Sequence, residues 1–220
     1  MAPSRAVVFD MDGLMFNTEE VYWDVGTELL RRRGYEFTKE LSDAMMGRPP
    51  RPAFEVMIDW HALKDTWEEL SAESEGIYID VLDNHLAPMP GLLDLLDALE
   101  AAGIPKAIGT SSQPKLVDAT LSPFEMHSRF QFILTARDIT YGKPHPEIYQ
   151  KAARLFGLLP REMVVLEDSQ TGCRAAAAAG AVVVAVPGKH SAGHDFGVAT
   201  LVAESLADPR LYQLLGLAQT

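Results

Sequence analysis

Residues 6–13 read Ala6-Val7-Val8-Phe9-Asp10-Met11-Asp12-Gly13, an apolar run that stops abruptly at two aspartates and a glycine. Short apolar runs that end at polar or glycine residues are typical of buried parallel strands. Residues i and i+2 of a strand point to the same face, so we expect the two aspartates to share one site, with Met11 turned away. Gly13 allows the backbone to approach a ligand closely. Taken alone, an acidic turn after a strand explains the same pattern.

Four further runs resemble this strand, and helical patterns lie between them. The candidate strands are Lys106–Thr110, Phe132–Leu134, Met163–Leu166 and Ala181–Val186. Apolar or small residues at helical spacing precede Gly103, Gly157 and Gly180, and glycine is a common helix stop. Strands that alternate with helices predict an α/β fold with a parallel sheet and right-handed crossovers.

Residues 16–87 interrupt this alternation, because they contain helical patterns and no good strand. One helix is predicted by Val21, Val25 and Leu29. A second is predicted by Trp60, Leu63, Trp67 and Leu70, and the segment 47–52 is predicted to be a turn between helices. The predicted organisation is therefore a core built from residues 1–15 and 88–220, with an all-helical insertion at 16–87 after the first strand.

Composition narrows the function classes. The chain has 220 residues with 47% hydrophobic and 23% charged residues, the ordinary mixture of a globular protein rather than of a disordered one. Its net charge of −12 argues against nucleic acids and anionic membranes as partners, although a local site can still bind a small anion. No run approaches the roughly 20 apolar residues of a membrane span and no signal peptide is evident, so we expect a cytoplasmic protein. The lone cysteine, Cys173, is better explained as buried packing than as a nucleophile.

Polar residues follow two of the other predicted strands, and a lysine lies in a loop before a predicted helix. Thr110 and Ser111 follow the second strand, and Glu167-Asp168-Ser169 follows another. Lys143 lies in the rigid loop Gly142-Lys143-Pro144 before a helix. Taken one at a time, Thr110 and Asp168 could be helix caps, and Lys143 could be a solvated surface lysine. Ligands of open parallel sheets bind at the carboxyl ends of the strands, so together the residues predict one site.

These motifs resemble those of the haloacid dehalogenase superfamily of phosphatases and phosphomutases. The resemblance rests on residues 9–14, on Thr110, on Gly142-Lys143-Pro144 and on Glu167-Asp168-Ser169, in the order that the family has them. The β-phosphoglucomutase-like and sugar-phosphatase-like subgroup is the most similar. The resemblance implies a Rossmann-like core, and it implies that the insertion is the family's helical cap domain.

The resemblance also implies covalent catalysis by two aspartates. Asp10 would be the nucleophile that forms an aspartyl-phosphate, and Asp12 would protonate the leaving group and later activate water. A carboxylate and a phosphate repel each other by roughly 4 kcal/mol per pair of unit charges at about 4 Å and an effective dielectric near 20. A hard cation with oxygen ligands would offset this repulsion. Since halide-displacing members lack the second aspartate, Asp12 favours a phosphoester substrate over a haloacid.

The remaining roles implied by the resemblance concern the cofactor and the phosphate group. Mg²⁺ would be bound by Asp10, the backbone carbonyl of Asp12 and Asp168, with Glu167 as a nearby acidic ligand or neighbour. The phosphate would be held by Thr110 and the amide of Ser111, and Lys143 would neutralise charge on Asp10 and on the phosphate.

In the insertion, Arg48 after Gly47 resembles the cap's substrate-specificity loop, although a solvent-exposed arginine is an equal alternative. Arg51 lies in the same segment. β-Phosphoglucomutases carry a histidine in the cap hinge, where this chain has Tyr22 and Trp23, which weakens the mutase hypothesis.

We therefore predict a Mg²⁺-dependent phosphatase that hydrolyses small phosphorylated metabolites, such as a sugar phosphate, through an aspartyl-phosphate. One alternative is a phosphomutase of the β-phosphoglucomutase type. The other is a catalytically idle fold that serves as a binding or regulatory module, which fold alone does not exclude.

Overall fold

The chain forms two compact units. The computed structural model describes residues 5–45, 48 and 50–217, and for residues 83–85 it describes the backbone alone. Met1–Asn17 and Ala87–Thr220 form one unit, which we call the core unit, and Thr18–Leu86 form the other, the helical unit.

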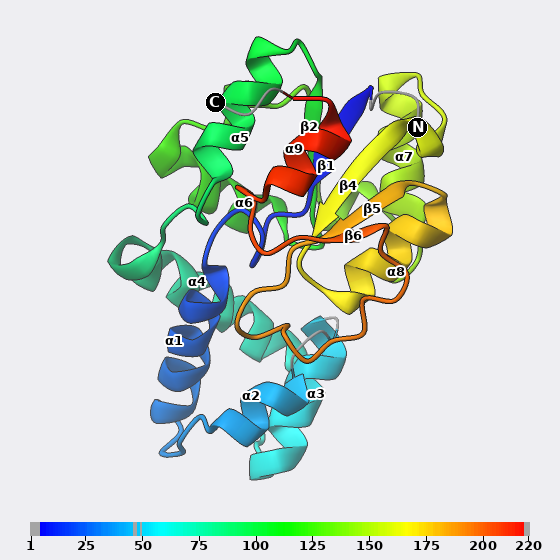
Figure 1. Cartoon of the computed structure of the whole chain (residues 1–220). Coiled ribbons are helices and arrows are strands. Elements are labelled where there is room, and N and C mark those ends of the chain that lie inside the picture. Colours follow the sequence, from blue (N-terminus) through cyan, green and yellow to red (C-terminus); the bar gives the residue numbers. More distant parts are fainter. Residues whose placement is uncertain (1–4, 46–47, 49, 218–220) are drawn as a thin grey trace. The chain divides into compact units, whose positions relative to one another are not determined.

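Within the described residues, the core unit is built around a six-stranded sheet of order β3-β2-β1-β4-β5-β6 (Figure 1). Every neighbouring pair is parallel, which confirms the predicted fold class. The strands are β1 (Ala6–Phe9), β2 (Lys106–Gly109), β3 (Ile133–Leu134), β4 (Met163–Glu167), β5 (Val182–Ala185) and β6 (Leu201–Val202). β6 was not predicted from the sequence.

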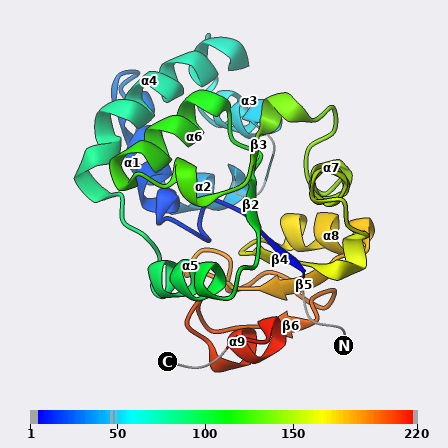
Figure 2. The ribbon, with the colours of Figure 1, turned by 90° about the horizontal axis from the view of Figure 1, so that it is seen from above.

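Helices cover both faces of this sheet (Figure 2). On one face lie α7 (Glu147–Phe156) and α8 (Gln170–Ala179), and on the other lie α5 (Leu92–Ala101) and α9 (Pro209–Leu215). α6 (Pro114–Leu121) follows β2. The predicted helix stops at Gly157 and Gly180 are confirmed, since both adopt the left-handed conformation that glycine accommodates most easily.

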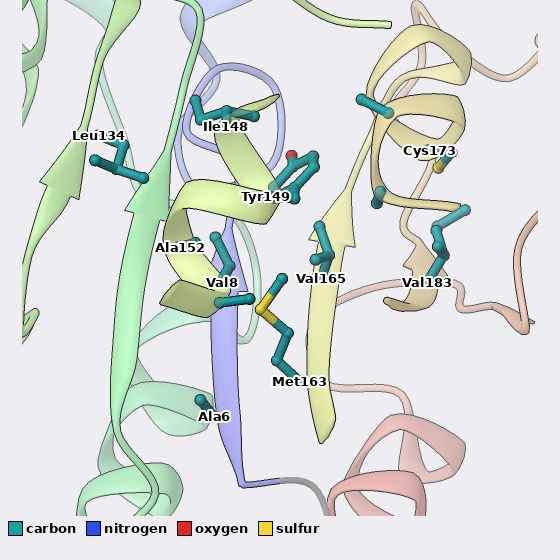
Figure 3. Close-up of a cluster of buried hydrophobic side chains, with 14 residues drawn as sticks. Ala6, Val8, Leu134, Ile148, Tyr149, Ala152, Met163, Val165, Cys173 and Val183 are labelled. Atoms are coloured by element: carbon teal, nitrogen blue, oxygen red, sulfur yellow. The ribbon is translucent and has the colours of Figure 1, made fainter. Parts of the chain in front are cut away.

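The face covered by α7 and α8 holds a hydrophobic core (Figure 3). Alternate residues of β1, Ala6 and Val8, point into it together with Val165 of β4, and all three are fully buried. Burying one valine completely contributes about 1.5–3 kcal/mol. The buried alanines of α8 have short side chains, so this helix can pack close to the strands. Cys173 belongs to this core and is fully buried, as predicted.

The helical unit consists of α1 (Thr18–Arg31), α2 (Lys39–Met45), α3 (Pro50–His61) and α4 (Trp67–His85). The predicted stripe of Val21, Val25 and Leu29 is buried on α1. Arg33, just after α1, bonds to Asp65 and to Glu73, each at 2.6 Å. The pair with Glu73 links the end of α1 to α4, and the pair with Asp65 links it to the residues just before α4.

One prediction about this unit was wrong, and the bounds of another differ. The expected single helix through Trp60 and Trp67 is broken between α3 and α4, because Ala62 has a positive φ of 50° and Thr66 starts a new helix. Thr66 and Glu69 form a reciprocal capping box at that start, a contact that stabilises helix N-termini. The predicted turn at 47–52 ends earlier than expected, because α3 already begins at Pro50. Proline lacks an N–H group, but the first N–H groups of a helix have no partner within the helix, so proline is well accommodated at this position.

None of the helices in the described residues has the length and hydropathy that a bilayer-spanning segment requires.

Candidate active site

Asp10 lies at the carboxyl edge of the sheet, between two strand ends. The register pairs Phe9 with Leu166 of β4 and with Ile108 of β2. The Asp10 amide continues this ladder by donating to the Leu166 carbonyl at 3.0 Å. Since β1 is central in the sheet, the ends of β4 and β2 flank Asp10 on either side. The sheet therefore brings Asp10 beside Glu167 and Gly109, which are far apart in sequence.

Lys143 joins these strand ends. Its ammonium donates to Asp10 Oδ1 at 2.5 Å, to Glu167 Oε1 at 2.6 Å and to the Gly109 carbonyl at 3.0 Å. A lysine has three N–H donors, so all three are used. Burial lowers the pKa of Lys143, but the carboxylates of Asp10 and Glu167 outweigh this and hold its pKa well above the ordinary value. Lys143 is therefore a fixed positive charge beside Asp10.

Glu167 is fully buried, and both of its oxygens have partners. Oε1 accepts from Lys143 and from the Tyr149 hydroxyl, and Oε2 accepts from Ser169 Oγ at 3.3 Å. A Cβ on Gly172 would lie 2.0 Å from the carboxylate, so only glycine leaves room for Glu167 at this point of α8. The first turn of α8 is thus in direct contact with the site.

Three of the carboxylates could hold a metal ion. Asp10, Glu167 and Asp168 are all buried, and one oxygen of each lies within 4.8 Å of the others. Carboxylate oxygens suit a hard divalent cation. Lys143 forms ion pairs with two of these carboxylates, Asp10 and Glu167. The oxygen ligands and the close grouping of these carboxylates therefore fit a divalent cation.

Burial also perturbs Asp10 itself. Desolvation raises the pKa of Asp10 to about 7, although Lys143 opposes the shift and Glu167 and Asp12 reinforce it. Added positive charge at the three carboxylates would favour the ionised form of Asp10, which is the form that can attack phosphorus.

Asp12 faces the end of β2. Its Oδ2 accepts from Ser112 Oγ at 2.6 Å and from Thr110 Oγ1 at 3.2 Å. Thr110 Oγ1 in turn accepts from the Ser112 amide at 3.0 Å. Thr110 is fully buried, whereas Ser111 is exposed. Of the two predicted phosphate-binding residues, Thr110 therefore contacts Asp12, and Ser111 is the exposed residue that follows it.

Sequence reasoning missed Ser112 and Tyr149. Ser112 is the second of two adjacent serines, and nothing in the pattern distinguishes it from Ser111. Tyr149 lies in α7, the helix after the Lys143 loop. In the sequence, an aromatic residue in such a helix predicts only hydrophobic packing. Its position six residues after Lys143 is the one signal that could have identified it.

Three residues singled out from the sequence, Gly47, Arg48 and Arg51, belong to the helical unit. Gly47 lies outside the described residues. Arg48 is exposed, and its Nε donates to the Ala44 carbonyl at 2.7 Å. Arg51 pairs with Glu55 at 2.8 Å and lies 5.9 Å from the centre of the Trp67 ring. The substrate-specificity role of Gly47 and Arg48 stays a prediction.

The sequence model of one protein family, described as haloacid dehalogenase-like hydrolase, matches residues 7–186 of this chain. The matched part includes Asp10, Lys143 and Glu167. The chain belongs to this family. That membership confirms the resemblance drawn from the motifs.

Individual proteins of the family are similar over most of their length. A Drosophila melanogaster protein named "Probable pseudouridine-5'-phosphatase" is 33% identical over 91% of this chain and 89% of its own. A phosphorylated carbohydrates phosphatase of Thermotoga maritima is 28% identical over 80% of this chain and 82% of its own. The crystal structure of CbbY from Rhodobacter sphaeroides, 24% identical, shares the fold with a TM-score of 0.83 over 92% of this chain and 95% of that one.

Proposed function

We propose that this haloacid dehalogenase-like hydrolase is a Mg²⁺-dependent phosphatase of small phosphorylated metabolites that works through an aspartyl-phosphate on Asp10. The observation that carries the proposal is the buried Asp10 carboxylate, bonded to Lys143 at 2.5 Å and grouped with Glu167 and Asp168. The relatives bear out hydrolysis of phosphoric monoesters over the phosphomutase and the non-catalytic module. Since their names include a phosphorylated-carbohydrate and a nucleoside-phosphate phosphatase, phosphates of sugars and nucleosides are the first substrates to test.

In the first step, a carboxylate oxygen of Asp10 forms a bond to phosphorus while the bond from phosphorus to the ester oxygen breaks. That oxygen leaves with the electron pair and takes a proton from Asp12, which yields the alcohol. In the second step, water attacks the phosphorus of the aspartyl-phosphate and gives a proton to Asp12. The Asp10–phosphorus bond then breaks, which releases inorganic phosphate and restores both carboxyl groups.

The cation site follows from the same residues. Asp10, Asp168 and Glu167 would bind Mg²⁺ through side-chain oxygens, and Asp12 would contribute its backbone carbonyl. When bound, the ion supplies positive charge that offsets the repulsion between carboxylate and phosphate. Lys143 supplies a further fixed positive charge next to Asp10. Mg²⁺ suits this set because it binds readily through a few carboxylates together with phosphate oxygens and water.

Phosphate would be held at the end of β2. The Thr110 hydroxyl and the Ser111 amide are donors there, and uncharged donors of this kind bind phosphate oxygens without adding titratable groups. Ser111 is exposed, so its amide lies in a segment that solvent reaches.

The test is phosphate release from p-nitrophenyl phosphate and from a panel of sugar and nucleoside phosphates, each with Mg²⁺ or with EDTA. We expect Mg²⁺-dependent phosphate release that equals substrate loss. Mass spectrometry of rapidly quenched enzyme should detect one phosphoryl group, located on Asp10. Undiminished turnover in EDTA would refute the metal assignment, and turnover by folded Asp10→Asn protein would refute the covalent step. Conversion of β-glucose 1-phosphate to glucose 6-phosphate without phosphate release would indicate a mutase.

A further inference from the structure

The Asp12 carboxylate is held through one of its two oxygens. Oδ2 accepts hydrogen bonds from Ser112 Oγ at 2.6 Å and from Thr110 Oγ1 at 3.2 Å. Oδ1 is buried and has no hydrogen-bond partner in the part of the chain that the structure describes. Both donors of Oδ2 are hydroxyls that follow β2, and the shorter bond comes from Ser112. The two oxygens of Asp12 are therefore in different environments.

Thr110 cannot serve both Asp12 and a phosphate group. A threonine hydroxyl has a single proton to donate, and Thr110 Oγ1 already accepts from the Ser112 amide at 3.0 Å. When Thr110 donates to the phosphate of a substrate, as the proposed function requires, its proton turns away from Asp12. Of the two hydroxyls bonded to Oδ2, the one that can stay on Asp12 is that of Ser112.

We propose that Ser112 is a positioning residue for Asp12. Its hydroxyl holds Oδ2 through the whole reaction, which fixes the rotation of the carboxyl group and leaves Oδ1 to carry the proton. During the first step that proton moves from Oδ1 to the departing ester oxygen, while the phosphorus–oxygen bond to the alcohol breaks and the bond to Asp10 forms. This inference rests on the proposed function, because it gives Ser112 a part in the same proton transfer.

The test compares leaving groups rather than total activity. Phenyl phosphate and p-nitrophenyl phosphate differ little in size, but phenolate needs a proton to leave far more than the weakly basic p-nitrophenolate does. The ratio kcat/KM reports the steps up to departure of the alcohol, whereas kcat also includes hydrolysis of the phospho-enzyme that both substrates share. We therefore expect Ser112→Ala to lower kcat/KM for phenyl phosphate by about tenfold or more, and for p-nitrophenyl phosphate much less, because a positioned acid contributes about 10²–10⁴-fold.

Two further variants separate positioning from a general structural effect. Ser112→Thr keeps a hydroxyl on the same carbon and should restore most of the phenyl phosphate activity. In an Asp12→Asn background, Ser112→Ala should change the ratio of the two substrates no further, because both substitutions act through the same carboxyl group. Ser74→Ala, which removes a hydroxyl bonded to Ser71 within α4 at 2.8 Å, is the matched control and should leave the ratio unchanged.

Equal losses of kcat/KM on both substrates, or no loss on either, would overturn the role of Ser112. So would a further selective loss when Ser112→Ala is added to Asp12→Asn. These outcomes are distinct from failure of the proposed function, which would show as absence of Mg²⁺-dependent phosphate release from p-nitrophenyl phosphate by the unmodified protein.

Discussion

Replacing Gly172 by alanine should damage both the stability of the protein and its catalytic centre. An added Cβ would lie 2.0 Å from Cδ, Oε1 and Oε2 of Glu167. Ordinary contacts between carbon atoms are about 3.5–4.0 Å, so the carboxylate or the start of α8 must move by about 1.5 Å or more. A movement of that size away from Lys143 would stretch the 2.6 Å bond between Lys143 and Glu167 beyond hydrogen-bonding distance.

The size of the effect follows from burial. Glu167 and Lys143 are both buried, and breaking a buried ion pair costs about 3–5 kcal/mol. Alanine favours a helix interior over glycine by up to about 1 kcal/mol, which offsets part of this loss. We expect a net decrease of about 2–4 kcal/mol in the free energy of unfolding. We also expect kcat/KM for p-nitrophenyl phosphate to fall by about 100-fold, because displacement of a catalytic group by about 1 Å can cost that much.

Urea unfolding and steady-state kinetics with Mg²⁺ measure the two effects on the same preparation. Gly76→Ala is the control, since Gly76 lies within α4 and a Cβ there meets nothing within 4 Å. That variant should be slightly more stable, by about 0.5–1 kcal/mol, with unchanged kinetics. A Gly172→Ala protein with the urea midpoint and kcat/KM of the unmodified protein would show that Glu167 is not confined by α8.

Three further predictions concern the nucleophile, the cation and the response to acid. Asp10→Asn should abolish phosphate release while circular dichroism and the urea midpoint show an intact fold, because an amide does not attack phosphorus. Asp168→Ala should raise the Mg²⁺ concentration needed for half-maximal activity by at least about tenfold, and an unchanged requirement would remove Asp168 from the cation site. Asp208 caps α9, and the hydrogen bond from Arg210 holds the pKa of Asp208 well below its usual range. The ionised Asp208 side chain therefore stabilises the protein above its unfolded pKa of about 3.9, and this contribution is lost as the pH falls further. The free energy of unfolding of Asp208→Ala should be lower than that of the unmodified protein by about 1 kcal/mol near pH 7, and this difference should shrink below about pH 4. A difference that stays constant down to pH 2 would contradict this.

Local pattern was enough to predict five of the six strands that the structure describes in the core unit. Apolar runs such as Ala6–Phe9 and Met163–Leu166 are buried on both faces, so nearly every residue in them is hydrophobic, and the run ends where the strand leaves the sheet. Helix ends at Gly157 and Gly180 are likewise encoded by single residues. Both kinds of signal act over a few residues, and they therefore survive in a single sequence.

Apolar periodicity alone did not locate two further features of the fold. The break between α3 and α4 was missed because the apolar spacing of Trp60 and Trp67 continues across it, while a capping box at Thr66 decides the boundary. β6 is a two-residue strand that exists because β5 offers it an edge to pair with. Pairing with β5 determined β6, whereas the boundary between α3 and α4 follows from a local contact of the Thr66 and Glu69 side chains with the backbone, which apolar periodicity does not report.

The sequence by itself determined which chemical groups are available: two aspartates after the first strand, a lysine before a helix, and an acidic pair after another strand. Only the tertiary structure decided which of their atoms meet. Lys143 bonds to Asp10 across 133 positions of sequence, and Ser112 bonds to Asp12 across 100. The fit of Gly172 against Glu167 and the bond from Tyr149 to the same carboxylate arise in the same way. The physical reason is that strand order and register bring these loops to one edge of the sheet, and contacts between residues so far apart leave no periodic trace in the chain.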